Sequence, residues 1–162
     1  KGLKVCFVGD GTNNVARSLM TGCAICGMDF SIAAPEGCQP PKHHVDELAG
    51  ICAASGASIS VHASMAEALD GAHCAYTDVW VSMGQEHETA AKEALLAPYQ
   101  LNAETMALTG RKESIFMHCL PAVKGKEVSF EVMEGSASRV WQEAENRKHT
   151  IKAIILALLG LS

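Results

Sequence analysis

Short apolar segments alternate with helix-forming segments along almost the whole chain, and this alternation limits the fold more than any other feature of the sequence. Five segments are short, apolar and followed by turn residues, as buried strands are: residues 3–9, 29–33, 58–61, 72–76 and 114–117. Helical spacing of apolar residues runs from Val15 to Cys26 and through residues 44–54, 65–69, 86–97, 103–108 and 136–159. Strands separated by helices cannot be hairpins. We therefore predict an α/β fold, a doubly wound sheet of five parallel strands in the order 3-2-1-4-5 with helices on both faces.

The composition is that of one globular domain covering residues 1–162. Of the 162 residues 48% are hydrophobic, and 18 Asp and Glu outweigh 13 Lys and Arg to give a net charge of −5. A nucleic acid or an anionic membrane surface needs a concentrated positive field, and the chain has no lysine or arginine tract. We expect a small-molecule partner, no nucleic acid and no membrane, since the apolar run 153–159 is far shorter than the roughly 20 residues that span a bilayer.

The cysteines and the first residue indicate the setting of the chain. The seven cysteines are an odd number and are scattered through apolar segments, unlike the disulfide framework of a small secreted protein. We therefore expect reduced thiols in a cytoplasmic compartment. The chain starts at Lys1 and enters a strand pattern within two residues, so we expect it to be a fragment of a longer protein.

Three polar segments follow strands one, four and five of the predicted sheet. They are residues 10–14, 78–84 and 118–121, which lie far apart in the sequence. In a doubly wound sheet, the loops at the carboxyl ends of the strands line one crevice, and ligands bind where the winding direction reverses, here between strands one and four. The sequence therefore predicts that these segments meet at one small-molecule site.

The first two of these segments each allow two interpretations. Residues 9–14 (GDGTNN) resemble a phosphate-binding turn but lack its third glycine, and their asparagine pair could cap the following helix or direct an amide at a ligand. In the second segment, Asp78, Ser82 and the backbone of Met83 could together hold the ammonium and carboxylate groups of an amino acid. Both Asp and Ser are also ordinary residues of a solvated turn.

The thiol of Cys119 stands at the end of the fifth strand, where it could serve chemistry or simply pack as a small buried hydrophobe. His118 should point to the opposite side of the extended chain, which favours a buried structural role. Arg147 lies on the polar half of the last helix and could be solvated or reach the crevice. Cys23 and Cys26 fall inside a predicted helix with no second ligand pair, so we interpret them as core residues and predict no metal site.

Four motifs together resemble those of the ornithine carbamoyltransferase family, in the same order and at similar spacing. These are residues 9–14 (GDGTNN), 78–84 (DVWVSMG), 118–121 (HCLP) and 143–150 (EAENRKHT). The resemblance covers essentially the whole chain and is to the carboxyl-terminal, ornithine-binding domain, which has a Rossmann-like fold. The aspartate relatives carry proline at the position of Cys119 and lack the Ser-Met-Gly loop.

The resemblance implies transfer of a carbamoyl group from carbamoyl phosphate to the δ-amine of L-ornithine, giving citrulline and phosphate with no cofactor. It implies that Asn14 and the Met83 backbone hold the ornithine carboxylate, that Asp78 and Ser82 hold its α-ammonium, and that Cys119 lies beside the δ-nitrogen. The δ-amine resembles that of lysine, with a pKa of about 10.4, so binding must lower this pKa before the amine can attack. An ionised carboxylate beside the amine would oppose this unless it is committed to the α-ammonium.

The resemblance also implies a carbamoyl subsite. The backbone carbonyls of Cys119 and Leu120 would accept hydrogen bonds from the carbamoyl NH2 group, and Arg147 would donate to the carbamoyl oxygen as charge develops there. Cys119, Asp78 and Arg147 would then be the catalytic residues. Directing two successive carbonyls at one group requires a sharp turn, so we predict a cis peptide bond between Leu120 and Pro121.

The family's phosphate-binding motifs, Ser-Thr-Arg-Thr-Arg and His-Pro-x-Gln, are absent from this sequence. We therefore expect an amino-terminal, carbamoyl-phosphate-binding domain to be missing, the chain to be inactive alone, and its last helix to expose apolar surface. The homotrimer of the family would form mainly through the missing domain. The alternatives are a carbamoyltransferase for another amine, a nucleotide-binding Rossmann module and a non-catalytic interaction domain. An animal source would imply the mitochondrial matrix.

Overall fold

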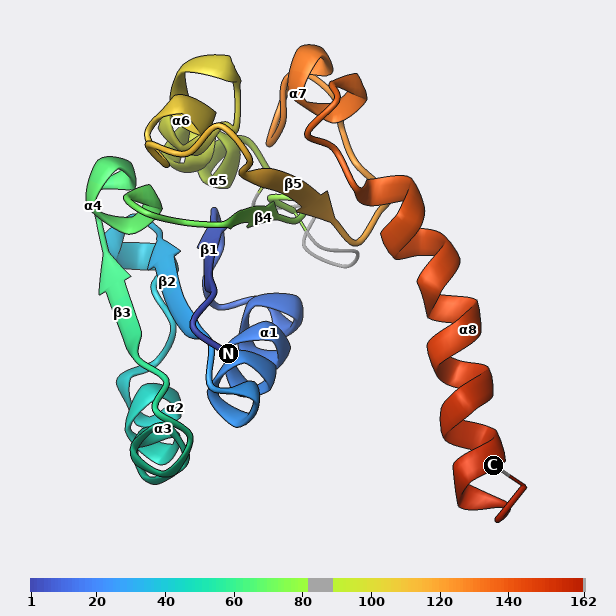
Figure 1. Cartoon of the computed structure of the whole chain (residues 1–162). Coiled ribbons are helices and arrows are strands. Elements are labelled where there is room, and N and C mark those ends of the chain that lie inside the picture. The colour runs from blue at the N-terminus through green and yellow to red at the C-terminus, as the bar shows by residue number, and fades with distance from the viewer. Residues whose placement is uncertain (82–88, 162) are drawn as a thin grey trace.

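A parallel five-stranded sheet forms the centre of the chain (Figure 1). The structure is a computed structural model, and it describes residues 1–81 and 89–161. The strands are β1 (Lys4–Val8), β2 (Asp29–Ala33), β3 (Ile59–His62), β4 (Cys74–Thr77) and β5 (Ile115–His118). All four pairings are parallel and the order is β3-β2-β1-β4-β5, so the predicted fold class and strand order are confirmed.

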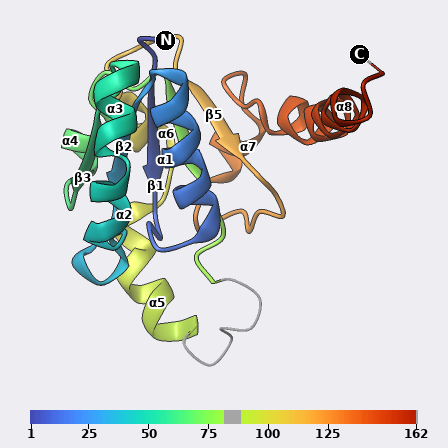
Figure 2. The same cartoon turned by 90° about the horizontal axis from the view of Figure 1, so that it is seen from below.

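Helices connect the strands and cover both faces of the sheet (Figures 1 and 2). They are α1 (Asn14–Cys26), η1 (Glu36–Cys38), α2 (Lys42–Glu47), α3 (Ala49–Ser55), α4 (Met65–Leu69), α5 (Thr89–Leu96), η3 (Ala97–Tyr99), α6 (Ala103–Ala107), α7 (Phe130–Glu134) and α8 (Val140–Leu158). The described part of the predicted helix 86–97 agrees with α5.

Two of the predicted helices have different limits in the structure. The helix predicted at 44–54 is two short helices, α2 and α3, which meet at Leu48. The last helix begins at Val140 and not at residue 136, because the backbone before it is bonded to β5 instead: Phe116 donates to the Ala137 carbonyl, and Arg139 donates to the Phe116 carbonyl. Hydrogen bonds to a neighbouring strand thus replace the first helical turn that the apolar spacing suggested.

Alternation along the strands divides the core into two clusters, one on each face of the sheet. In β1, Phe7 packs with α1 and α3, whereas its neighbours Cys6 and Val8 pack on the opposite face, with α4 and α7. The same alternation separates Ala75 from Tyr76 in β4. Because both faces are covered, the carboxyl-terminal parts of β1 and β2 and the whole of β4 are buried, which explains their short apolar sequences.

The register of the sheet places three strand ends side by side. Val8 of β1 is opposite Thr77 of β4, and Thr77 is opposite His118 of β5. The residues that follow these positions, among them Asp78 and Cys119, therefore leave the sheet at the same level of the same edge.

Helix α8 extends away from the sheet, as both views show (Figures 1 and 2). Val140 in its first turn is fully buried. Further along, its apolar side chains are exposed: Ile151 51%, Ile154 58%, Ile155 51% and Leu158 82%. This agrees with the expected exposure of apolar surface on the last helix. Among the described residues, no helix has the length and hydropathy needed to cross a membrane.

Replacing Phe116 tests the core beneath the site. Phe116 of β5 is fully buried, so Phe116→Ala should lower the free energy of unfolding by about 3–5 kcal/mol through lost burial and the cavity that remains. The measurement is the midpoint of urea unfolding followed by circular dichroism. Phe130→Ala is the matched control, because Phe130 is 65% exposed and should change the free energy by about 1 kcal/mol or less. Equal shifts for the two variants would contradict the described packing.

Candidate functional site

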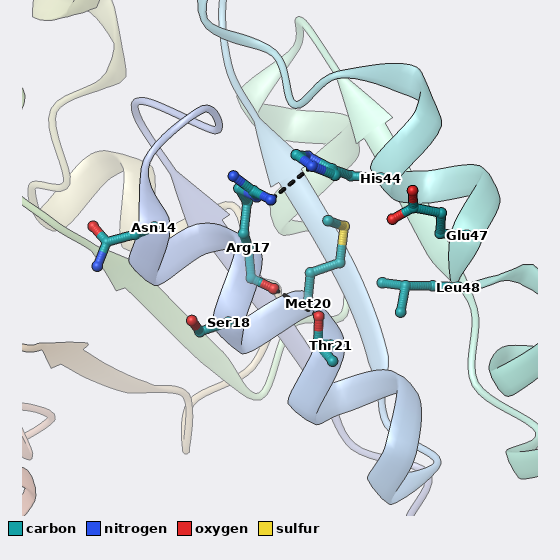
Figure 3. A pocket seen from close by; sticks show the side chains of 8 residues that line it. All are labelled: Asn14, Arg17, Ser18, Met20, Thr21, His44, Glu47 and Leu48. Carbon is teal, nitrogen blue, oxygen red and sulfur yellow. Dashed lines mark hydrogen bonds between the residues drawn. The ribbon is translucent and has the colours of Figure 1, made fainter.

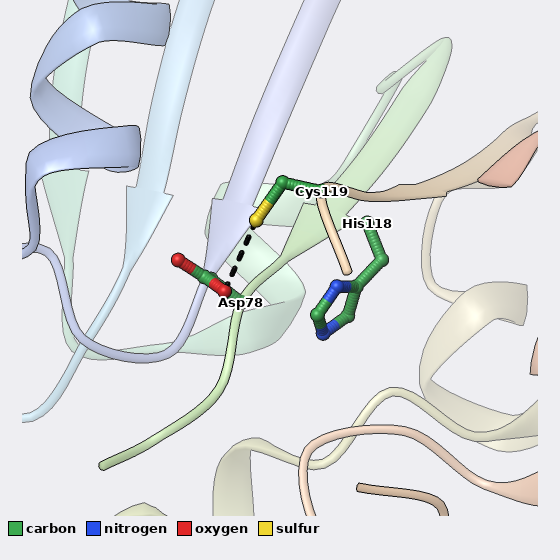
Figure 4. Close-up of side chains that lie close together, drawn as sticks. All are labelled: Asp78, His118 and Cys119. Atoms are coloured by element: carbon green, nitrogen blue, oxygen red, sulfur yellow. Dashed lines mark hydrogen bonds between the residues drawn. The ribbon is translucent and has the colours of Figure 1, made fainter. Parts of the chain in front are cut away.

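Asp78 and Cys119 meet at the carboxyl edge of the sheet, where β4 and β5 end (Figure 4). The Cys119 thiol donates a hydrogen bond to Asp78 Oδ1, with a sulfur–oxygen distance of 3.1 Å. The two residues are 41 positions apart in the sequence, and the parallel register brings them together. The convergence of the loops after strands four and five is therefore a feature of the structure.

The carboxylate of Asp78 is held by hydrogen bonds to both oxygens. Oδ1 accepts from the Val79 backbone N–H at 2.8 Å as well as from Cys119, and Oδ2 accepts from the side-chain amide of Asn13 at 2.8 Å. Asp78 is 9% exposed and Asn13 is 7% exposed. Buried carboxylates need such donors, because an unpaired one would be strongly destabilising. The result is a carboxylate of defined orientation at the carboxyl edge of the sheet.

Asn13 caps α1, as one interpretation of the asparagine pair predicted, and it also makes a second contact, to a side chain of the same chain. Its Oδ1 accepts hydrogen bonds from the backbone of Val15 and Ala16, which caps α1, while its amide nitrogen faces Asp78. The capping pattern alone indicated the first function. Nothing in the sequence indicated the second, because the partner lies 65 residues away.

Asn14 begins α1 and its side chain is exposed. It lies at one end of a groove of about 480 Å³ between α1 and α2 (Figure 3). Arg17 and His44 are hydrogen bonded across this groove at 2.6 Å, and loss of hydration, with the neighbouring guanidinium, lowers the pKa of His44.

In the first loop, the carboxylate of Asp10 is bonded to Thr12 of the same loop and to Lys92 of α5. Asp10 Oδ1 accepts hydrogen bonds from both the backbone and the hydroxyl of Thr12, and Asp10 Oδ2 forms an ion pair with Lys92 at 2.5 Å. Gly11 is required for packing, since a Cβ there would lie 2.9 Å from Pro40 Cδ. The glycines that resembled a phosphate-binding turn therefore serve close packing and turn geometry in this structure.

The turn after β5 is supported from below by a buried pair. The Leu120-Pro121 peptide bond is cis, as predicted, and Leu120 has a φ of 58°. The Leu120 backbone N–H donates to His118 Nδ1 at 2.9 Å, and His118 Nε2 lies 3.3 Å from Glu127 Oε1. His118 is fully buried, which agrees with the structural role expected for it.

Glu127 is a supporting residue that the sequence did not reveal. It is 1% exposed, and its Oε1 also accepts a hydrogen bond from the Val123 backbone at 2.5 Å. Glu127 lies in a loop of mixed polarity, and such a sequence is typical of a solvent-exposed loop. Only the fold shows that its carboxylate is buried beside a histidine.

The Cys119 thiol is in its neutral form at ordinary pH. Burial, followed by the hydrogen bond to Asp78 and the charge of Asp78, raises the pKa of Cys119 to about 12. Next to it, Tyr76 donates a hydrogen bond to Glu143 Oε1 at 2.5 Å. Burial, followed by the hydrogen bond to Glu143 and the charge of Glu143, raises the pKa of Tyr76 as well. The site therefore combines two carboxylates, Asp78 and Glu143, with the two neutral, weakly acidic groups that donate to them.

The remaining predicted site residues do not all meet at this point. Arg147 is exposed on α8, one turn after Glu143, and within the described ranges it makes no hydrogen bond to Asp78 or Cys119. Ser82 and Met83 lie outside the described residues.

Asp78, His118 and Cys119 also form a group whose possible metal-ligating atoms all lie within 4.8 Å of one another. Each already has a partner in the chain: the thiol and the carboxylate bond to each other, and His118 Nδ1 accepts from Leu120. A metal ion would have to compete with these bonds, so the arrangement fits hydrogen bonding better than metal ligation.

The raised pKa of Cys119 leads to a testable prediction on its reactivity. At pH 8 a thiol of pKa about 12 is almost entirely protonated, so Cys119 should react with iodoacetamide at least about tenfold more slowly than exposed Cys26. Asp78→Asn removes the charge and should accelerate the reaction severalfold, though burial, the largest cause, remains. Peptide mass spectrometry measures both sites in one sample. Equal labelling of Cys119 and Cys26 in the unaltered chain would contradict the prediction.

Comparison with known proteins places the chain in a family. A family model described as aspartate/ornithine carbamoyltransferase, Asp/Orn binding domain, matches residues 1–158. The ornithine carbamoyltransferases of Thermotoga maritima and Caldanaerobacter subterraneus are 53% and 51% identical over 98% of this chain and 51% of theirs. The chain thus spans about half the length of these curated relatives.

Solved structures agree with the sequence relatives. Ornithine carbamoyltransferase from Pyrococcus furiosus matches with a TM-score of 0.90 at 40% identity, covering 96% of this chain and 49% of that one. The anabolic ornithine carbamoyltransferase from Campylobacter jejuni matches with a TM-score of 0.91 at 34% identity, over 99% of this chain and 52% of that one. The chain therefore belongs to the aspartate/ornithine carbamoyltransferase family and corresponds to its Asp/Orn binding domain.

Proposed function

We propose that this chain is the ornithine-binding half of an ornithine carbamoyltransferase, which transfers a carbamoyl group from carbamoyl phosphate to the δ-amine of L-ornithine. The observation that carries the proposal is the contact between Asp78 and Cys119, a carboxylate held by three donors beside a neutral thiol. The relatives described above are named for this activity. The amino-terminal half would bind most of the carbamoyl phosphate, whose anionic groups need cationic motifs that this chain lacks.

In this proposal Asp78 recognises the α-ammonium group of ornithine. Its carboxylate is oriented by Asn13 and Val79. Ser82 would share the ammonium, while Asn14 and the Met83 backbone would hold the ornithine carboxylate. The start of α1, where Asn14 stands, carries the positive end of the helix dipole, which favours a carboxylate there.

The neutral thiol suits the chemistry at the other end of ornithine. The δ-amine must lose its proton before it attacks, and a negative charge nearby would stabilise the protonated form. A thiol with a pKa of about 12 contributes no such charge, whereas a carboxylate at the position of Cys119 would. The charge of Asp78 is neutralised when it pairs with the α-ammonium, and the negative charge that remains nearby is that of Glu143, which is bonded to the Tyr76 hydroxyl.

The carbamoyl group would be held by the turn after β5 and by α8. The carbonyls of Cys119 and Leu120 would accept hydrogen bonds from its NH2 group. Arg147 would stabilise the charge that develops on the carbamoyl oxygen. The exposed apolar side of α8 would pack on the amino-terminal half, within a homotrimer of complete chains.

The setting that we propose is arginine metabolism in a reducing compartment, the cytoplasm or, in an animal, the mitochondrial matrix. All seven cysteines are free thiols. No cofactor takes part in the proposed reaction. The nucleotide-binding alternative is not favoured, because the glycines of the first loop are used in packing and its carboxylate is paired with Lys92.

Ligand binding by the chain itself tests the recognition of ornithine. L-ornithine or L-norvaline at about 100 times its dissociation constant should stabilise the chain by about 2.7 kcal/mol, seen as a rise in melting temperature. Asp78→Asn should abolish the rise, because the α-ammonium loses its counter-ion. Asp46→Asn, the same change at a carboxylate 58% exposed on α2, should leave it intact. A rise with ornithine blocked at its α-amine would favour another amine substrate, and no rise with any of these ligands would contradict the proposal.

Citrulline formation tests the division of labour. The chain alone should form none, and mixing it with the amino-terminal half of the Thermotoga maritima relative should restore activity. In that mixture Arg147→Lys, which keeps the charge but loses the two-pronged donor, should lower kcat by at least about tenfold. Arg111→Lys is the control, because Arg111 is exposed and precedes the amino end of β5, whereas the site lies at the carboxyl ends of the strands. Full activity of the unmixed chain would refute the assignment of the two halves.

A further inference from the structure

Tyr76 borders the site beside Cys119, but the proposed reaction gives it no role. It is the third residue of β4, it is 4% exposed, and its ring stacks on Phe7 of β1 with 6.1 Å between ring centres. Its hydroxyl nevertheless leaves the core and donates to Glu143 Oε1 at 2.5 Å. A buried phenol could find an acceptor on its own strand or loop, so a partner 67 residues away calls for a physical account.

Glu143 is in the first turn of α8, the part of that helix that contacts the sheet. Val140 is fully buried there, and the backbone before it is bonded to Phe116 of β5. The other oxygen of Glu143, Oε2, is withdrawn from solvent and has no hydrogen-bond partner among the described residues. Leaving a buried carboxylate oxygen without a donor costs free energy of folding, and the hydrogen bond from Tyr76 to Oε1 offsets part of this cost. That bond connects α8 to the central strands.

Arg147 is four residues beyond Glu143 and therefore lies on the same side of α8, one turn further along. From Glu145 onward, nearly all side chains of the helix are exposed. The direction in which α8 leaves the sheet, and with it the position of Arg147, thus depends on contacts made in the first turn. Among these, the bond between Tyr76 and Glu143 is a charge-assisted one, the stronger kind of hydrogen bond.

We propose that Tyr76 is a positioning residue: through Glu143 it holds the first turn of α8 so that Arg147 is presented to the carbamoyl group over the turn at Cys119 and Leu120. The inference rests on the proposed function for the role of Arg147. The attachment of α8 itself does not depend on that function and can be tested separately.

Hydrogen exchange of the 162-residue chain tests the attachment. Tyr76→Phe keeps the ring that stacks on Phe7 and removes the hydroxyl, so amides of residues 140–147 should exchange about tenfold faster. Glu143→Ala should have the same effect, and the double variant should be no worse than either single one. Glu143→Gln keeps an accepting oxygen and should restore protection to within about twofold of the unaltered chain. Glu145→Gln, on the same helix but 67% exposed, is the matched control.

Two results of this experiment would overturn the inference. Unchanged exchange at 140–147 in Tyr76→Phe would mean that the bond does not hold α8. Exchange that rises equally in peptides from β1 and β2 would mean that Tyr76 only supports the core.

The mixture with the amino-terminal half tests the consequence for catalysis. Tyr76→Phe and Glu143→Ala should each lower kcat about tenfold and leave the KM for ornithine within about twofold, because Asp78 and Asn13 are not attached to α8. A rise in the KM for ornithine as large as the fall in kcat would overturn the inference, since Tyr76 would then act on Asp78 and Cys119 directly. Absence of citrulline from the unaltered mixture would refute the proposed function instead, and the exchange result would still decide the attachment of α8.

Discussion

The parallel hydrogen-bond register between β1, β4 and β5 is the constraint on which the site depends. Because Val8, Thr77 and His118 are aligned across three strands, the residues that follow them emerge at one level. A shift by one residue in either pairing would turn the side chains after the strands to the other face and separate Asp78 from Cys119. The two faces of the sheet are packed against helices, and this packing prevents such a shift. The core thus determines the geometry of the polar groups at its edge.

At that edge a charged carboxylate, Asp78, lies next to a neutral thiol, Cys119, with 3.1 Å between sulfur and oxygen. Asp78 remains surrounded by donors, from Asn13, from its neighbour in the chain and from the thiol. Cys119, in contrast, keeps its proton because of burial and of the same carboxylate. An amino acid with one ammonium and one reactive amine requires opposite treatment of its two nitrogens. Two adjacent strands can provide the two environments, because Asp78 follows β4 and Cys119 follows β5.

Much of the fold could be predicted from the sequence, because continuous apolar runs and helical spacing report burial directly. The strand order and the meeting of the loops at Asp78 and Cys119 followed from the rules of parallel sheets. The partners of buried polar groups could not be predicted in this way. Asn13 to Asp78, Glu127 to His118 and Tyr76 to Glu143 join residues that are distant in sequence or differ little from ordinary surface residues. The start of α8 was misjudged for a related reason, since backbone bonds to β5 leave no mark on side-chain spacing.

The length of α8 gives its first turn a mechanical importance. A helix of 19 residues is about 28 Å long, so tilting it by 10° about its base moves its far end by about 5 Å. A surface that packs on the apolar side of α8 would therefore be displaced more than the first turn of the helix itself when that turn tilts. Because α8 joins the sheet beside the ends of β4 and β5, a small change in the orientation of its first turn displaces its far end by several ångströms.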